Sequence, residues 1–108
     1  MTGIARGAPV IIVLHSPREK SWGILDEITP AGVFLRGLDL NSFDDWLRAV
    51  VHDEPFVGVG DQFFPLWRVE RLSRDESSGG IASLYEQVEQ RTGRTVEELL
   101  ASRDEGVA

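Results

Sequence analysis

Cysteine is absent from this chain of 108 residues. A chain without thiols forms no disulfide, offers no thiolate nucleophile and holds no cysteine-ligated zinc or iron–sulfur centre. The absence is typical of a reducing compartment. Long hydrophobic runs are missing as well, because the apolar stretch at residues 8–14 is too short for a secretory signal or a membrane span. We therefore expect a cytoplasmic protein with no membrane partner.

Basic residues are also few, with 11 Lys and Arg against 18 Asp and Glu and a formal net charge of −7. Nucleic-acid binders usually present a basic field, because neutralising phosphates supplies much of their affinity. The acidity is concentrated in residues 75–108, which hold eight acids and three arginines. The charge balance therefore disfavours a nucleic-acid partner, although it leaves room for a local basic patch.

Catalytic and cofactor signatures are a third absence. No serine lies in a Gly-x-Ser-x-Gly elbow, and no glycine-rich loop has phosphate-binding spacing. His52, Asp53 and Glu54 offer an imidazole and two carboxylates, which suit zinc, manganese or iron. No second histidine follows at helical spacing. We expect no enzyme activity, no cofactor and no metal, and keep a metal-dependent enzyme at these three residues as a second alternative.

A pattern of strands dominates what is present. β-Branched and alternating apolar residues predict strands at residues 9–15, 22–29 and 33–40. Short turns join these segments, which predicts an antiparallel meander. The stretch FFPLWRVERLSR at residues 63–74 predicts a final strand or two short ones, because Pro65 cannot donate a ladder hydrogen bond.

Apolar residues at helical spacing interrupt and follow the strands. The first stripe predicts a short helix near residues 42–51 and consists of Phe43, Trp46, Leu47 and Val50. The second stripe follows a linker at residues 74–80 and consists of Ile81, Leu84, Tyr85 and Val88. Gly93 is placed to end that helix. A capping-box pattern from Thr95 to Glu98 predicts a last helix at residues 96–102.

The chain is the size of one domain. We expect a flexible N-terminus at residues 1–8, a small barrel domain at residues 9–74, and a linker with a helical tail at residues 75–108. Residues 103–108 are expected to fray. The fold class is mainly β, and α+β overall.

Two short segments resemble the first motif of the Sm-like (LSm) small β-barrel superfamily: WGILDEI at residues 22–28 and GVFL at residues 32–35. The resemblance covers residues 10–74 and implies a small, strongly bent antiparallel barrel in an RNA-binding ring. The second motif of the family carries an Arg-Gly or Lys-His element, and residues 64–69 contain neither. A helix inserted near residues 42–51 is a further departure, so the fold is better supported than RNA binding.

Arginines and an aromatic residue offer the one candidate ligand or RNA surface, at Arg36, Trp67, Arg68 and Arg71. Exposed aromatic rings beside arginines suit single-stranded nucleic acid, since bases stack on the rings. A regular strand, however, places Arg68 and Arg71 on opposite faces. This phase favours a structural strand over an RNA groove.

The helical stripes need an apolar surface to cover them, either within the chain or on a neighbour. The residues we consider for self-association are Phe43, Trp46, Ile81, Leu84, Tyr85 and Val88. Exposed strand edges of small barrels also pair between subunits. The sequence thus favours a non-catalytic binding or assembly module that forms a homo-oligomer or binds a protein partner. An RNA-binding Sm-like ring is the first alternative, and a monomer with its tail packed back is the alternative to an oligomer.

Overall fold

The computed structural model describes residues 3–101, in which five strands form one antiparallel sheet. The strands are β1 (Pro9–Leu14), β2 (Glu19–Thr29), β3 (Gly32–Asp39), β4 (Gly60–Pro65) and β5 (Val69–Arg74). The described residues also form helices α1 (Phe43–Val51), α2 (Leu84–Thr92) and α3 (Val96–Leu100). Short 3-10 turns lie at η1 (Leu40–Ser42) and η2 (Leu66–Arg68). The mixed α+β class with mostly strands is confirmed.

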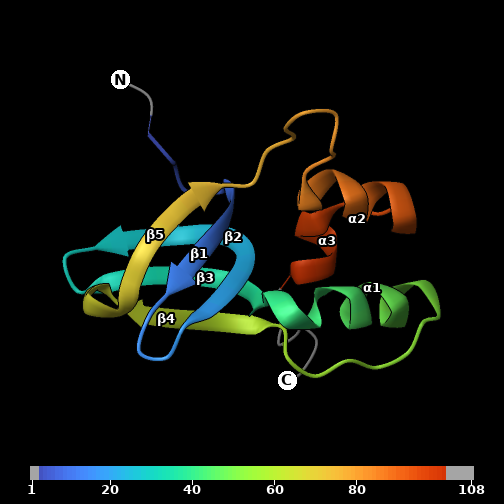
Figure 1. Cartoon of the computed structure of the whole chain (residues 1–108). Helices are drawn as coiled ribbons and strands as arrows, with labels where there is room; N and C mark the ends of the chain where they lie inside the picture. Colours follow the sequence, from blue (N-terminus) through green and yellow to red (C-terminus); the bar gives the residue numbers. More distant parts are fainter. Residues whose placement is uncertain (1–2, 102–108) are drawn as a thin grey trace.

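The strand order is β4-β3-β2-β1-β5, so β4 and β5 are the two edges (Figure 1). Pro65 ends β4, and the η2 turn separates it from β5, so residues 63–74 contribute to two strands rather than one. No ladder joins β4 to β5. The sheet is therefore open between its edges, and a closed barrel is not confirmed.

One face of the sheet, called the inner face below, gathers apolar side chains from all five strands. Its fully packed members are Val10, Ile12, Leu14, Leu25, Val33 and Leu35. Phe64, Val69 and Leu72 from the two edge strands are only partly buried against them. The side chains at the centre of the inner core are therefore buried, and those at both edges of the sheet remain partly exposed.

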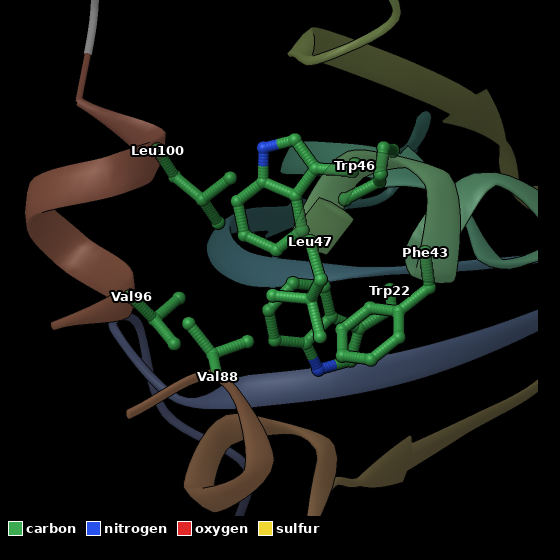
Figure 2. Packing of buried hydrophobic residues seen from close by; sticks show 8 residues of the cluster. Trp22, Phe43, Trp46, Leu47, Val88, Val96 and Leu100 are labelled. Atoms are coloured by element: carbon green, nitrogen blue, oxygen red, sulfur yellow. The ribbon is translucent and has the colours of Figure 1, made fainter. Parts of the chain in front are cut away.

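The opposite face, called the outer face, is covered by the helices. Figure 2 shows side chains of all three helices meeting Trp22 of β2. The cluster comprises Trp22, Leu38, Phe43, Trp46, Leu47, Val88, Val96 and Leu100. Trp22 is fully buried and its ring lies 5.2 Å from Phe43 and 5.8 Å from Trp46, centroid to centroid. Burying aromatic rings of this size is a main source of stability in small domains.

A glycine pair lets β2 and β3 approach closely where the outer core begins. Gly23 lies opposite Gly37 in the ladder. A Cβ atom added at Gly37 would lie 2.0 Å from the carbonyl oxygen of Trp22, and one at Gly23 would lie 2.3 Å from that of Arg36. Only glycine fits at either position.

The helix ends follow the sequence signals in part. Ser83 caps α2 in a full capping box with Glu86, and Gly93 ends the helix in a left-handed conformation with φ of 71°. Thr95 caps α3 by accepting from the Glu98 amide. The predicted helix around Ile81 begins later, at Leu84, because the Ser83 cap sets its start.

The N-terminal segment packs onto the sheet where it is described. The Gly7 amide donates to the Leu25 carbonyl at 2.8 Å, and the Leu25 amide donates to Ala8 at 2.9 Å. Ile4 and Ala8, in the segment expected to be flexible, contact the inner core. The predicted fraying of residues 103–108 and the last residue of the helix at 96–102 lie outside the described residues.

Candidate interaction surface

The outer edge of β4 carries backbone groups that bond to no other strand within residues 3–101. The Leu66 amide donates to the Ala31 carbonyl at 2.9 Å, which continues the β3–β4 ladder into η2. In an antiparallel ladder alternate residues bond to the neighbour. Asp61 and Phe63 are out of phase with Leu66, so their N–H and C=O groups point away from the sheet.

The edge of β5 is free in the same way. The Asp75 amide donates to the Pro9 carbonyl at 2.9 Å, which continues the β1–β5 ladder. Leu72 and Arg74 are out of phase with Asp75 and present their backbone groups outward. Both edges are therefore templates for an added strand.

The two edges carry opposite charge. On β4 the only ionisable residue is Asp61, whose side chain is 86% exposed and lies 3.5 Å from Arg36. On β5 Arg71 and Arg74 outnumber Glu70, which pairs with Arg18. In the part of the chain that the structure describes, Arg71 makes no ion pair or side-chain hydrogen bond. An acidic edge and a basic edge attract each other, whereas two like edges repel.

Phe34 and Phe63 form an aromatic pair beside the β4 edge. They lie opposite each other in the β3–β4 ladder, with ring centroids 4.8 Å apart. The Phe63 ring lies over Gly32, where a Cβ would be 2.9 Å from it. The rings are more than a third exposed on the outer face, beyond the helices. They line a pocket of about 250 Å³ together with Asp26, Leu35, Asp61 and Gln62.

One polar atom at this edge has no partner. The side-chain oxygen of Gln62 is buried and accepts no hydrogen bond from the residues that the structure describes. Buried polar groups are normally paired, and leaving one unpaired costs stability.

The residues proposed for an RNA surface are not brought together. Arg36 caps the end of α3, donating to the Leu100 carbonyl at 2.6 Å and to Ala101 at 3.1 Å. Arg68 lies in η2, donates to the Pro17 carbonyl at 2.8 Å and pairs with Glu19 at 3.0 Å. The alternation of a regular strand does not apply to Arg68, because the η2 turn separates it from β5.

Trp67 and Arg71 differ from these two arginines because both are exposed. Trp67 is 65% exposed, and its ring meets His15 edge to face at 6.2 Å between centroids. Arg71 lies on β5, on the outer face beside Val13.

The residues proposed for self-association lie mostly inside the chain. Phe43, Trp46 and Val88 belong to the outer core, and Leu84 and Tyr85 pack partly against it. Ile81 is 70% exposed in the loop before α2. The tail covers the sheet of its own chain, and among the described residues of its apolar stripes Ile81 is the one that stays exposed.

Asp75 is the polar residue that sequence reasoning missed. Its buried carboxylate accepts from the Trp22 indole N–H at 3.0 Å and from the amides of Leu84 and Tyr85 at 3.0 and 2.8 Å. It thereby ties the end of β5 to the first turn of α2, where a negative charge is favourable. The acidic stretch from Asp75 onward concealed it, since a buried acid and a solvated one look alike in sequence.

Tyr85 links the two tail helices. Its hydroxyl donates to the Glu97 carboxylate at 2.8 and 2.9 Å. This hydrogen bond, with burial and the negative charges of Glu97 and Glu89, raises the pKa of Tyr85 to about 12. The phenol is thus kept protonated as a donor.

His52, Asp53 and Glu54 follow α1 as an exposed loop, with Asp53 at a φ of 55°. Residues 3–101 contain no group of three His, Asp or Glu side chains arranged to hold a metal ion. Within the same range no helix is long and apolar enough to cross a membrane.

No family model matches the sequence, and neither a curated protein nor a solved structure gives a significant match.

Proposed function

We propose that this protein is a non-catalytic assembly module whose sheet is a small Sm-like barrel and whose partner is a second copy of the same chain. The observation that carries the proposal is the pair of free sheet edges with opposite charge, β4 acidic and β5 basic. The copies meet with β4 of one against β5 of the next. Such a head-to-tail contact forms a ring when its rotation closes and a filament when it does not.

Three features support an Sm-like barrel. The bent meander carries a glycine pair at Gly23 and Gly37, a short turn leads into β3, and the inner core draws on all five strands. The helix α1 lies between β3 and β4 in the sequence but packs against the outer face of the sheet, so β3 and β4 still pair directly with each other (Figure 1).

Two features favour an added strand over a monomer. The inner core thins toward both edges, where Phe64 and Leu72 remain partly exposed. A strand docked at each edge would cover them. It would also place backbone donors and acceptors opposite those of Asp61, Phe63, Leu72 and Arg74.

Proline variants test the contact without breaking the sheet. The N–H groups of Asp61 and Arg74 point outward, so Asp61→Pro and Arg74→Pro remove no backbone hydrogen bond to β3 or β1. Asp61→Pro does remove the side-chain ion pair with Arg36 of β3. Each variant blocks one edge and leaves the other intact. We expect each to be monomeric at a concentration where the wild type associates, and an equimolar mixture to form a dimer and nothing larger. The masses are measured by light scattering on a sizing column.

The result that contradicts the proposal is equally specific. If either variant alone retained the wild-type mass, the edges would not be the contact. If the mixture stayed monomeric while far-UV circular dichroism showed both variants folded, unlike edges would not meet. A wild-type protein that is monomeric throughout would also overturn it.

A second candidate function, RNA binding in a ring, is favoured by the exposed Trp67 beside His15. Trp22 and Trp46 are buried, so a change in tryptophan emission on adding an oligouridine would report on Trp67. Binding to RNA predicts an affinity that falls steeply with salt and is reduced by Trp67→Ala. No emission change at low salt would remove this candidate.

A further inference from the structure

We propose that the second half of β2 binds an extended peptide of a partner protein, which adds to the sheet as a short strand and carries a basic side chain. β2 is long and bent (Figure 1). β1 pairs with β2 only as far as Ile24, whereas β3 continues its ladder to Thr29. The hollow beside this half of β2 has no lining residue from β4 or β5, so the inference does not depend on the proposed self-association.

The N-terminal segment leaves β2 at a turn. Residues 7–8 still bond to Leu25, and the Ala8 amide also donates to the Ala5 carbonyl at 3.0 Å. Gly7 has a φ of 93°, so the chain turns here. No backbone hydrogen bond joins residues 3–6 to residues 26–29. The chain before the turn therefore does not continue the β1 ladder along β2.

The backbone of Ile28 faces this unpaired side. Leu25 directs its N–H and C=O groups to the N-terminal segment, so its ladder partner Leu35 bonds to β4 instead. Val33 is in phase with Leu35, as is Ala31, whose carbonyl accepts from η2. Ile28 is the β2 partner of Val33 and therefore directs its own groups away from β3. Within residues 3–101 no strand pairs with Ile28 on that side.

A hollow of about 410 Å³ lies beside this backbone. Its lining consists of Ile4, Arg6, Leu25, Asp26, Glu27 and Ile28. Ile28 is 51% exposed, and Ile4 is half-buried against the inner core. An exposed strand backbone beside apolar side chains is the arrangement that strand addition uses, since the backbone supplies affinity and the side chains supply specificity.

The two faces of β2 set the order of side chains in the peptide. Ile28 lies beside Val33 on the inner face, and Glu27 lies beside Phe34 on the outer face. A peptide that takes the place of β1 runs antiparallel to β2. The residue opposite Ile28 packs against it, and the next residue toward the C-terminus of the peptide lies opposite Glu27. The recognised sequence is therefore an apolar residue followed by a basic one.

The charges beside β2 favour a cation. In the part of the chain that the structure describes, Glu27 makes no ion pair, and Asp26 pairs with Arg6 alone at 3.3 Å. The Arg6 and Asp26 side chains are 82% and 54% exposed, and exposed pairs contribute little. A basic side chain thus meets two carboxylates and displaces one weakly held arginine. A second copy of β2 is a poor occupant, since it brings acids against acids.

Amide hydrogen exchange, followed by NMR on the full chain, tests the premise before any peptide is added. We expect the Ile28 amide to exchange at least about tenfold faster than the Leu25 amide, which donates to Ala8 at 2.9 Å. An Ile28 amide as protected as that of Leu25 would overturn the inference, because this side of β2 would already be paired.

The binding probe is the capped peptide Thr-Thr-Val-Arg-Thr with a fluorescent label, followed by anisotropy. We expect saturable binding at millimolar protein concentrations or below. An N-methyl group on the valine amide should weaken it about tenfold, because it removes the donor to the Ile28 carbonyl. Glutamine in place of arginine should weaken it about threefold.

Substitution of Ile28 assigns the site on the protein. Ile28→Ala should weaken binding about fivefold, because it removes the apolar contact to the valine. Ile81→Ala is the matched control, because Ile81 is an isoleucine that is 70% exposed in the loop before α2. It should leave the dissociation constant unchanged.

Arg6→Ala should strengthen binding about twofold, because Asp26 loses the arginine that competes with the peptide. Arg18→Ala is the matched control, because Arg18 belongs to a similarly exposed pair with Glu70. It should leave binding unchanged. Weaker binding after Arg6→Ala would contradict the displacement of Arg6.

The outcomes that overturn the inference differ from those that concern self-association. No saturable binding of the probe, or binding that N-methylation leaves unchanged, overturns strand addition at β2. Equal affinities of the arginine and glutamine peptides overturn the basic residue, and equal effects of Ile28→Ala and Ile81→Ala overturn the position of the site. The proline variants at the two sheet edges test self-association separately.

Discussion

Asp75 connects the sheet to the helical tail through a single buried carboxylate. It accepts three hydrogen bonds, one from an indole and two from backbone amides. The sequence does not distinguish Asp75 from the adjacent acid Glu76, which is exposed. Burial of one acid in an acidic stretch is decided by where β5 ends relative to α2, which is a tertiary property.

Replacing Asp75 by alanine should destabilise the protein. Three buried donors lose their acceptor, and we expect the free energy of unfolding to fall by about 2–4 kcal/mol. Urea unfolding followed by tryptophan emission measures it, because Trp22 is one of the three donors. The control is Glu76→Ala at the exposed neighbour, expected within about 0.5 kcal/mol of the wild type. Equal effects of the two substitutions would show that the carboxylate does not anchor α2.

Tyr85 should lose its proton at a higher pH than an ordinary tyrosine does. Its pKa is raised from 10.0 to about 12 mainly by the hydrogen bond to Glu97. The chain has one tyrosine, so the near-ultraviolet absorbance of phenolate reports on this residue alone. We expect the midpoint close to pH 12, and a lower midpoint in Glu97→Gln.

The sign of the stability effect follows from the direction of the pKa shift. A phenol whose pKa is higher in the folded state contributes stability that is fully present below pH 10 and is lost between pH 10 and 12. A wild-type midpoint at 10 would contradict the Tyr85–Glu97 contact between α2 and α3.

At the scale of the elements, the sequence is most informative where an apolar stripe or a glycine stop marks a helix. The α1 stripe at Phe43 and Trp46 and the Gly93 stop both appear as predicted. The sequence does not decide whether residues 63–74 form one strand or two, because a 3-10 turn after Pro65 has no periodic signal. The close approach of β2 and β3 at their glycines cannot be predicted from the sequence, because it depends on which strands pair.

The glycine pair should tolerate no side chain. Gly37→Ala forces a Cβ against the Trp22 carbonyl, a backbone atom that cannot rotate away. We expect a loss of about 1–3 kcal/mol in the free energy of unfolding, as for overpacked cores. Gly60→Ala is the matched control, because a Cβ there meets nothing within 4 Å. If Gly37→Ala unfolded at the same urea concentration as Gly60→Ala, the close approach of the strands would be wrong.

At the scale of the whole molecule, the candidate site lies elsewhere than the sequence suggested. The tail stripes, offered for a neighbour, cover the outer face of their own sheet, as Figure 2 shows for Val88 and Leu100. Among the proposed RNA residues, Arg36 donates a hydrogen bond to the end of α3, and Arg68 donates one to the turn at Pro17. Periodicity reveals that a face is apolar and not which surface covers it. The free edges emerge only once the strand order is known.

The native mass is the most direct test of the central claim, that the chain assembles through its sheet edges. It is measured by light scattering on a sizing column over a range of concentrations, with absorbance at both the nucleic-acid and protein maxima. We expect a multiple of the 12.0 kDa chain mass that declines on dilution, without excess nucleic-acid absorbance. A single-chain mass at every concentration would contradict the account.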